Sequence, residues 1–311
     1  MLANKHLLGL ADVPAEDIQQ IIDTGFRFRE VLERPIKKVP SLRGKTIVNL
    51  FFENSTRTRI SFELAQKRLS ADTVNFSASS SSLKKGETFK DTAQNIEAMK
   101  IDAVVMRHPT PGAPLHLTKF IDAVVINAGD GTHEHPTQAI LDMMSLQEVF
   151  GKLKGLKVGI IGDISHSRVA LSNIIGLTTM GAQVTLCGPP TLMPPQVDTL
   201  GVEVNTNLDE VLDWADAVNV LRIQMERMGV GMFPSVREYR RCFGLTIDRI
   251  QQLDRELIIM HPGPMNRGIE IDSQVADSDR AIILNQVLNG VASRMAILYL
   301  LLGGKPQVSE A

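Results

Sequence analysis

Residues 51–63 read Phe51-Phe52-Glu53-Asn54-Ser55-Thr56-Arg57-Thr58-Arg59-Ile60-Ser61-Phe62-Glu63, a strand end followed by the start of a helix. Ser55 and Thr56 stand at the expected N-cap, where a hydroxyl ordinarily satisfies an unbonded backbone N–H. Arg57 and Arg59 follow in the first turn, although a helix start already carries roughly half a positive charge. Backbone amides, hydroxyls and guanidinium groups together bind a phosphate well. The segment therefore predicts an anion site; the alternative is a Ser-capped helix whose arginines reach only into solvent.

The composition is that of an ordinary globular protein, with 43% hydrophobic and 22% charged residues in 311. This length predicts about two domains. A net charge of −2 provides no general basic field, so we expect no nucleic-acid partner. Cys187 and Cys242 lack metal-ligand spacing and predict a reducing compartment. Without a signal-peptide core or an apolar run of membrane length, the sequence predicts a cytoplasmic protein with no membrane partner.

Short apolar strands and helices alternate along the whole chain. The strands are expected at residues 46–52, 73–76, 103–106, 123–126, 158–161, 184–186, 217–221 and 257–260. Such alternation is typical of parallel sheets covered on both faces. We therefore predict an α/β fold of two doubly wound domains, each with a mostly parallel sheet flanked by helices, joined by interdomain helices such as 136–150. In the helix after the first strand, Ile60, Leu64 and Leu69 are expected to form the buried stripe.

Polar residues gather where the predicted strands end. These clusters are residues 55–59, 107–108, 127–135, 163–168, 222–227 and 261–266. In open parallel sheets, ligands bind beyond the carboxyl ends of the strands. The clusters therefore predict a ligand site in each half of the chain.

Two other motifs carry less weight. Residues 159–163 begin like a dinucleotide-binding loop, but the third glycine is absent and no acid follows Leu186 to hold a ribose. His133-Glu134-His135 contains good zinc ligands, but no HExxH motif or clear third ligand accompanies it. The sequence therefore favours neither NAD nor a metal ion.

Taken together, the motifs resemble those of the aspartate and ornithine carbamoyltransferases. Residues 52–59 resemble the carbamoyl-phosphate signature of that family, and further matches extend nearly end to end. They lie at residues 84–88, 106–109, 127–131, 135–138, 162–168, 222–227 and 261–264. The ornithine enzymes typically carry a His-Cys-Leu-Pro turn and a Ser-Met-Gly segment, whereas this chain has His261-Pro262-Gly263-Pro264 and no Ser-Met-Gly. The pattern Arg222-x-Gln-x-Glu-Arg also suits an anionic second substrate better than a cationic one.

The resemblance implies transfer of the carbamoyl group of carbamoyl phosphate to the amino group of L-aspartate, an early step of pyrimidine biosynthesis. It implies a carbamoyl-phosphate-binding domain over residues 1–135, completed by a C-terminal helix at about 287–311, and an aspartate-binding domain over residues 136–286. No cofactor is expected, because the substrate already contains a good leaving group. The protein needs only to bind two anions, orient an amine and stabilise an oxyanion.

The resemblance also implies a role for each matching residue. The carbamoyl-phosphate ligands would be Ser55, Thr56, Arg57, Thr58, Arg107, His135, Gln138, Pro262 and Gly263. The residues acting in catalysis would be Arg57, Thr58, Lys85, Arg107 and His135. Aspartate would be bound by Lys85, Arg168, Arg222 and Gln224. Planar guanidinium groups match carboxylates better than a lysine does, and His135 would donate to the developing oxyanion.

Three further residues have implied roles beyond direct binding. Glu53 and Arg227 would form salt bridges that brace a closed arrangement, the alternative being two exposed charges of little energetic weight. Lys85 would serve the active site of a neighbouring subunit, which makes a homotrimer with shared sites the family expectation. A regulatory chain or a dihydroorotase remains open as a further partner.

Three alternatives stay open from the sequence. The first is a carbamoyltransferase for another amino acid, such as ornithine, which product analysis would distinguish. The second is a catalytically silent scaffold, which is disfavoured because every motif position is intact. The third is a nonenzymatic anion- or nucleotide-binding module, which is disfavoured by two separate anion sites on the two halves of the chain.

Overall fold

The computed structural model describes residues 2–77, 88–224 and 235–303. By its internal contacts the chain divides into two compact units. Unit 1 comprises Met1–Met144 with Leu288–Ala311, and unit 2 comprises Ser145–Val287. Both changes of unit fall inside a helix, namely α5 (Pro136–Phe150) and α11 (Ile283–Leu302).

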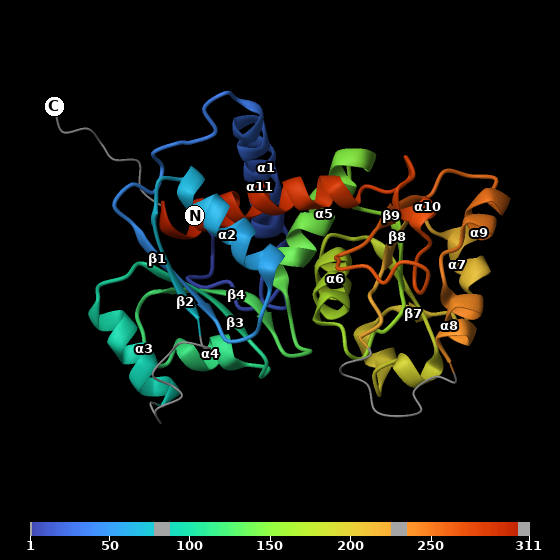
Figure 1. Ribbon diagram of the computed structural model, residues 1–311, viewed down its shortest axis with the longest axis horizontal. Helices are drawn as coiled ribbons and strands as arrows, with labels where there is room; N and C mark the ends of the chain where they lie inside the picture. Colours follow the sequence, from blue (N-terminus) through green and yellow to red (C-terminus); the bar gives the residue numbers. More distant parts are fainter. Residues whose placement is uncertain (1, 78–87, 225–234, 304–311) are drawn as a thin grey trace. The chain divides into compact units, whose positions relative to one another are not determined.

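Unit 1 is built on a four-stranded parallel sheet of order β2-β1-β3-β4. Its strands are β1 (Thr46–Phe51), β2 (Asp72–Ser77), β3 (Ala103–His108) and β4 (Val124–Asp130). Its other helices are α1 (Ala15–Glu33), α2 (Thr56–Arg68), α3 (Phe89–Ala98) and α4 (Ala113–Leu117). Figure 1 shows α3 and α4 on one side of this sheet and α1 and α2 on the other. Because both faces are covered, the inner strands β1 and β3 are buried along nearly their whole length.

The buried face of α2 differs from the predicted one. Phe62 and Leu69 are fully buried, whereas Ile60 is 48% and Leu64 37% exposed. Phe62, Ala65 and Leu69 recur at the i, i+3, i+7 spacing of one helix face, and Ile60 and Leu64 lie on another face. The prediction that Ile60 and Leu64 belong to the buried stripe is therefore wrong.

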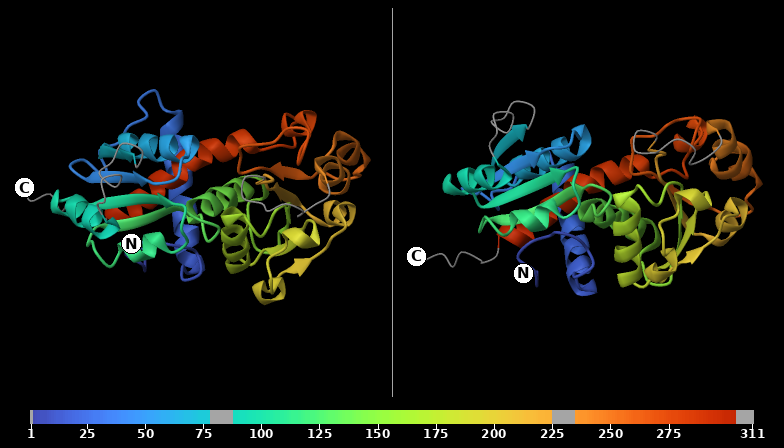
Figure 2. Two further views of the ribbon diagram at one scale, coloured as in Figure 1. Left: turned by 60° about the horizontal axis from the view of Figure 1, so that its bottom comes forward. Right: turned by 90° about the horizontal axis from the view of Figure 1, so that it is seen from below.

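Unit 2 contains a five-stranded parallel sheet of order β7-β6-β5-β8-β9. Its strands are β5 (Lys157–Ile161), β6 (Gln183–Cys187), β7 (Glu203–Val204), β8 (Ala217–Val220) and β9 (Ile258–Met260). Its helices are α6 (Arg168–Thr179), α7 (Leu208–Trp214), α8 (Val236–Phe243), α9 (Ile247–Gln252) and α10 (Ser273–Ala276), with short 3₁₀ turns at Pro190–Leu192 and Val197–Leu200. Helix α6 lies on one side of the sheet and α7 and α9 on the other, as Figure 1 and both views of Figure 2 show.

The two parallel α/β sheets flanked by helices confirm the predicted fold class. Every predicted strand is present, and the helix 136–150 has the predicted bounds. The elements that the sequence did not predict are short: β7, α4, α8, α9 and α10. Elements of this length contain too few residues to show a hydrophobic period. Among the described helices, none has the length and apolar character needed to cross a membrane.

Candidate active site

The N-terminus of α2 differs from those of α6, α7 and α8 in how its cap residue is bonded. Ser55 is its N-cap residue, with extended backbone angles, but its side chain makes no capping hydrogen bond. Ser167, Ser235 and Asn207 cap α6, α8 and α7, and each accepts a hydrogen bond from an amide of its own helix. The Ser55 hydroxyl is therefore not engaged in a capping bond, which suits an anion-binding helix start.

The first turn of α2 carries positive charge. Helix α2 has no acidic residue in its first turn. Arg57 reaches solvent, and partial desolvation of its guanidinium lowers its pKa. Thr58 is buried beside it, with 8% of its surface exposed. A bound anion would favour the charged form of Arg57, and the phosphate cradle at this helix start remains a prediction.

Arg107, near the end of β3, is held by a carboxylate and by a backbone oxygen. Its side chain is 11% exposed, and its Nη2 donates to Glu53 Oε1 over 2.7 Å. Its Nη1 donates to the backbone oxygen of Ala128 over 3.2 Å. The Phe52 amide donates to the Arg107 backbone oxygen, so the loop after β1 is attached to β3. Glu53 therefore has an ion-pair partner inside unit 1, whereas its predicted closure role remains a prediction.

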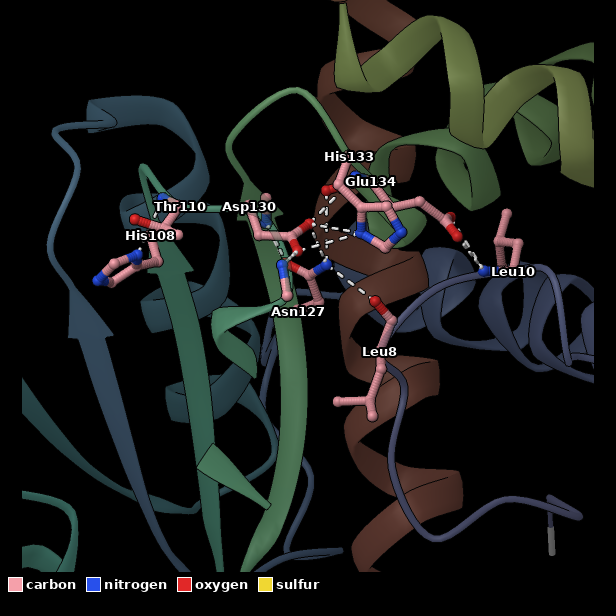
Figure 3. Close-up of polar contacts among 10 residues, drawn as sticks. Leu8, Leu10, His108, Thr110, Asn127, Asp130, His133 and Glu134 are labelled. Atoms are coloured by element: carbon pink, nitrogen blue, oxygen red, sulfur yellow. Dashed lines mark hydrogen bonds and ion pairs between the residues drawn. The ribbon is translucent and has the colours of Figure 1, made fainter. Parts of the chain in front are cut away.

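The loop that leads from β4 to His135 is held by a buried polar network, shown in Figure 3. The Asn127 side-chain amide donates to Asp130 Oδ1 over 2.8 Å, and the Glu134 amide donates to the same oxygen over 3.1 Å. His133 Nδ1 lies 3.1 Å from Asp130 Oδ2, with about half of its side chain exposed. Asp130 is therefore the centre around which this loop folds.

Two contacts fasten that network to distant parts of unit 1. The Leu10 amide donates to both Glu134 carboxylate oxygens, over 3.2 and 3.0 Å. Asn127 Nδ2 also donates to the Leu8 backbone oxygen over 2.8 Å (Figure 3). Both carboxylate oxygens of Glu134, in the His133-Glu134-His135 triplet, thus accept from the Leu10 amide. Among the described residues, no group of three or more His, Cys, Asp or Glu side chains is arranged to hold a metal ion.

His135 directly precedes α5 and is buried, with 4% of its surface exposed. Its backbone oxygen accepts hydrogen bonds from the amides of Gln138 and Ala139, which begin the helix. Gln138 Nε2 donates to Asp142 Oδ1 over 2.9 Å, which fixes that side chain along the helix. Both residues predicted at the carbamoyl group are therefore held on the first turn of α5.

Arg294 of α11 is a buried cation near this region that the sequence did not single out. Its Nη1 donates to the Ser61 hydroxyl of α2 over 3.1 Å, and its guanidinium lies 5.0 Å from the Phe62 ring centroid. Burial lowers its pKa to about 10, an effect that Asp142 opposes and Arg107 reinforces. The signal in the sequence would have been a lone arginine in the apolar stretch Val291–Leu302.

In unit 2, the residues predicted to bind aspartate lie on two interlocked strand-end loops. Arg168 begins α6 and is 5% exposed, whereas Arg222 is half-buried just after β8. Gln224 Nε2 donates to the His166 backbone oxygen over 3.0 Å, joining the two loops. His166 Nδ1 lies 2.8 Å from Asp163 Oδ1, and burial raises the pKa of Asp163 against the effect of that contact. The structure thus brings the loops of Arg168, Arg222 and Gln224 together.

A third loop, after β9, joins these two. The Asn266 side-chain amide donates to the Ile223 backbone oxygen over 3.2 Å. Pro262 and Gly263 lie at the start of this loop and are partly exposed, and Gly263 has a φ of +60°, which favours glycine. Lys85 and Arg227 lie outside the described residues, so their predicted roles remain predictions.

Comparison with known proteins places the chain in a family. Residues 5–148 match the carbamoyl-phosphate-binding domain of the aspartate/ornithine carbamoyltransferases, and residues 154–301 match the Asp/Orn-binding domain. The chain belongs to the aspartate/ornithine carbamoyltransferase family. This confirms the resemblance found in the sequence motifs.

Relatives on the aspartate side of this carbamoyltransferase family are highly similar over nearly the whole chain. The aspartate carbamoyltransferase catalytic subunit of Gemmatimonas aurantiaca is 59% identical over 307 residues, covering 99% of this chain and 96% of the relative. That of Christiangramia forsetii is 61% identical over 300 residues, covering 96% and 97%.

Solved structures of both branches share the fold. Aspartate transcarbamoylase from Trypanosoma cruzi in complex with carbamoyl phosphate has a TM-score of 0.87 at 29% identity, covering 96% of each chain. Ornithine carbamoyltransferase from Pyrococcus furiosus has a TM-score of 0.85 at 29% identity, covering 96% of this chain and 97% of that one. The fold therefore does not separate the two substrates, whereas sequence identity favours the aspartate side.

Proposed function

We propose that the protein transfers the carbamoyl group of carbamoyl phosphate to the amino group of L-aspartate, giving N-carbamoyl-L-aspartate and phosphate. The observation that carries this proposal is the N-terminus of α2, where Ser55 makes no capping bond and the first turn has arginines but no acid. Its relatives at 59–61% identity over nearly the whole chain are aspartate carbamoyltransferases. The product would enter pyrimidine biosynthesis.

The residues of unit 1 suit the first substrate. Phosphate would accept from the Ser55 and Thr56 hydroxyls, the first amides of α2 and the guanidinium groups of Arg57 and Arg107. Thr58 would complete this cradle. Charge develops on the carbonyl oxygen when the amine attacks, and a fixed donor aimed at that oxygen lowers the barrier. His135 would supply this donor, with Gln138 at the carbamoyl nitrogen.

The residues of unit 2 suit a second substrate with two carboxylates. Arg168 and Arg222 each offer a planar guanidinium that pairs with a carboxylate in two parallel hydrogen bonds. Gln224 adds an amide, while the backbone of Pro262 and Gly263 would contact the carbamoyl nitrogen and the attacking amine. The amine attacks directly, and the departing phosphate can accept its proton. No step calls for a metal or an organic cofactor.

A direct assay tests the proposal. Purified protein is incubated with carbamoyl phosphate and either L-aspartate or L-ornithine, and the products are identified by mass spectrometry. We expect N-carbamoyl-L-aspartate with aspartate and no citrulline with ornithine. Citrulline formation at a comparable rate would instead support the alternative carbamoyltransferase, and no product with either amine would refute the enzymatic proposal.

We further propose a homotrimer in which each site takes Arg57 from one subunit and Lys85 from the next. Supporting this, Ile60 and Leu64 of α2 and Val74 of the edge strand β2 are apolar and at least 37% exposed in the single chain. Exposed apolar side chains on a sheet edge and its adjoining helix are typical of a subunit contact. We also place the protein in the cytoplasm, and a regulatory chain or a dihydroorotase would be an additional partner.

Subunit mixing tests the shared site. Arg57→Ala and Lys85→Ala chains, each inactive alone, are mixed in equal amounts, dissociated and reassembled. Every hybrid trimer then contains one interface where an intact Arg57 meets an intact Lys85, so about a quarter of all sites regain activity. If remixing restores nothing while wild-type chains treated identically recover, Lys85 does not act across subunits.

A further inference from the structure

The segment Asn266-Arg267-Gly268-Ile269-Glu270, which follows the turn of Pro262 and Gly263, has no role in the reaction as proposed. It ends at a fully buried carboxylate, since Glu270 has 0% of its surface exposed. An isolated buried charge is strongly unfavourable, so it requires hydrogen-bond donors. The hydrogen-bond donors that contact the Glu270 carboxylate identify the groups that Glu270 holds in place.

Two donors converge on one oxygen of this carboxylate. The Asn266 backbone amide donates to Glu270 Oε1 over 2.5 Å. His261 Nε2 lies 3.4 Å from the same oxygen, and both side chains have 0% exposure. Glu270 Oε2 is also buried and has no hydrogen-bond partner among the described residues. Both contacts of the carboxylate are therefore made by Oε1, which links His261 and Asn266 in the loop after β9.

The hydrogen bonds of His261 define its tautomer. The Gly263 amide donates to His261 Nδ1 over 2.8 Å, so Nδ1 is the unprotonated nitrogen. A neutral imidazole then carries its proton on Nε2, which is the nitrogen that faces Glu270. The two contacts reinforce each other, because an acceptor at Nε2 stabilises the form of the ring that accepts from Gly263.

Asn266 connects the loop after β9 to the neighbouring loop that contains Ile223. Asn266, whose backbone amide is bound by Glu270, donates its side-chain amide to the Ile223 backbone oxygen. Ile223 lies between Arg222 and Gln224, which are proposed to bind aspartate. A single buried carboxylate thus stands behind both the Pro262–Gly263 turn and the segment that recognises the second substrate.

We propose that Glu270 is a positioning residue that acts through His261 and Asn266. Its carboxylate fixes the His261 ring, the ring fixes the Gly263 amide, and the backbone of Pro262 and Gly263 is thereby aimed at the reacting amine. The inference deepens the proposed function and rests on it for the assignment of this turn to the substrate. The hydrogen-bonded arrangement itself stands independently of that assignment.

Kinetics of Glu270→Gln provide the first test. The amide keeps the shape but removes the charge, and it places an NH₂ group either at Oε1, against the Asn266 N–H, or at the partnerless Oε2 position. Loss of a hydrogen bond to a charged group reduces the rate by about 10- to 100-fold when it serves the transition state. We expect this loss in kcat, with the affinity for carbamoyl phosphate unchanged.

Arg267→Ala is the matched control, because Arg267 lies on the same loop with its guanidinium paired to Asp277 at the surface. We expect wild-type kinetics from it. Should Glu270→Gln not fold, Glu270→Asp keeps the buried charge and shortens its reach, and the same fall in kcat is expected. Wild-type kcat in a folded Glu270→Gln or Glu270→Asp protein would overturn the proposal.

A double-mutant cycle separates positioning from a general effect on stability. Asn in place of His261 retains an acceptor for the amide two residues on, as in an Asx turn, but cannot relay the effect of Glu270. In the His261→Asn background, Glu270→Gln should therefore lower kcat by a smaller factor than it does in the wild type, because only the Asn266 contact remains. Two losses that simply multiply would show that Glu270 does not act through His261.

Hydrogen exchange followed by mass spectrometry gives a readout that needs no activity. In the wild type, the amides of Gly263 and Asn266 are bonded to His261 and Glu270 and should exchange slowly. We expect exchange over residues 261–270 to be at least about tenfold faster in Glu270→Gln and unchanged elsewhere in unit 2. Unchanged exchange in this loop would refute the positioning role, whereas a wild-type protein that does not carbamoylate aspartate would refute only the proposed function.

Discussion

Replacing Ser55 by alanine removes a hydroxyl that makes no capping hydrogen bond to its own helix. The usual penalty for deleting an N-cap hydroxyl, about 1 kcal/mol, should therefore be absent from the free protein. When carbamoyl phosphate is bound, the same hydroxyl would contact a charged phosphate oxygen. A hydrogen bond to a charged group contributes about 1.5–3 kcal/mol, so the dissociation constant should rise by about 10- to 150-fold.

Ser235→Ala is the matched control, because its hydroxyl accepts from the Glu238 amide over 3.1 Å and caps α8. This variant should lose about 1 kcal/mol of stability, or about 2–4 °C in Tm, and keep its affinity for carbamoyl phosphate. Isothermal titration and thermal unfolding of both variants give the four required values. If Ser55→Ala binds within about twofold of the wild type, or is destabilised as much as Ser235→Ala, the reasoning about this helix start is wrong.

Three further predictions concern charged residues of the two units. Arg57→Ala should lower kcat/KM by about 100-fold or more, since one lost anion donor costs about 3 kcal/mol. Arg59→Ala removes a charge from the same turn and should lower kcat/KM far less. Equal losses in the two variants would indicate a general electrostatic field rather than a direct contact from Arg57. Arg222→Ala should raise the KM for aspartate by at least about tenfold. Direct titration should show that its affinity for carbamoyl phosphate is unchanged. An unchanged KM for aspartate would show that Arg222 does not bind this substrate. Glu53→Gln removes the carboxylate charge 2.7 Å from Arg107, which would otherwise compete with a bound anion. The variant should therefore bind inorganic phosphate up to about fivefold more tightly at low salt. Weaker phosphate binding would mean that Glu53 orients Arg107 instead of competing with the anion.

The strands and their polar ends could be predicted because each leaves a local signal. Residues 158–161 form an apolar run long enough for a buried strand and too short for most helices, and β5 occupies Lys157–Ile161. Once such strands are placed in parallel, the polar residues that follow them must meet at one edge. The loops of Arg168 and Gln224 meet in this way.

The supports behind these loops could not be predicted, because their partners lie far away in the sequence. The Glu134 carboxylate binds the Leu10 amide across 124 residues, and Arg294 reaches Ser61 across 233. The hydrophobic period also does not show which of two apolar helix faces is buried. This is why the prediction of a buried Ile60 is wrong. The resemblance to a family indicates which residues are proposed to bind the substrates, but it assigns no role to Asp130, Arg294 or Glu270.

The two proposed substrate sites differ in how their polar groups are bonded in the free protein. In unit 1, the Ser55 hydroxyl forms no capping bond, so binding an anion adds hydrogen bonds without breaking a cap. In unit 2, the side-chain amides of Gln224 and Asn266 already donate hydrogen bonds to neighbouring loops. Glu270 in turn binds the Asn266 backbone amide and so holds the loop after β9 in place. Unused donors raise affinity, whereas loops locked in advance lower the ordering cost of placing a nucleophile. Substitutions at the start of α2 should therefore be felt first in binding, and substitutions behind the unit 2 loops first in turnover.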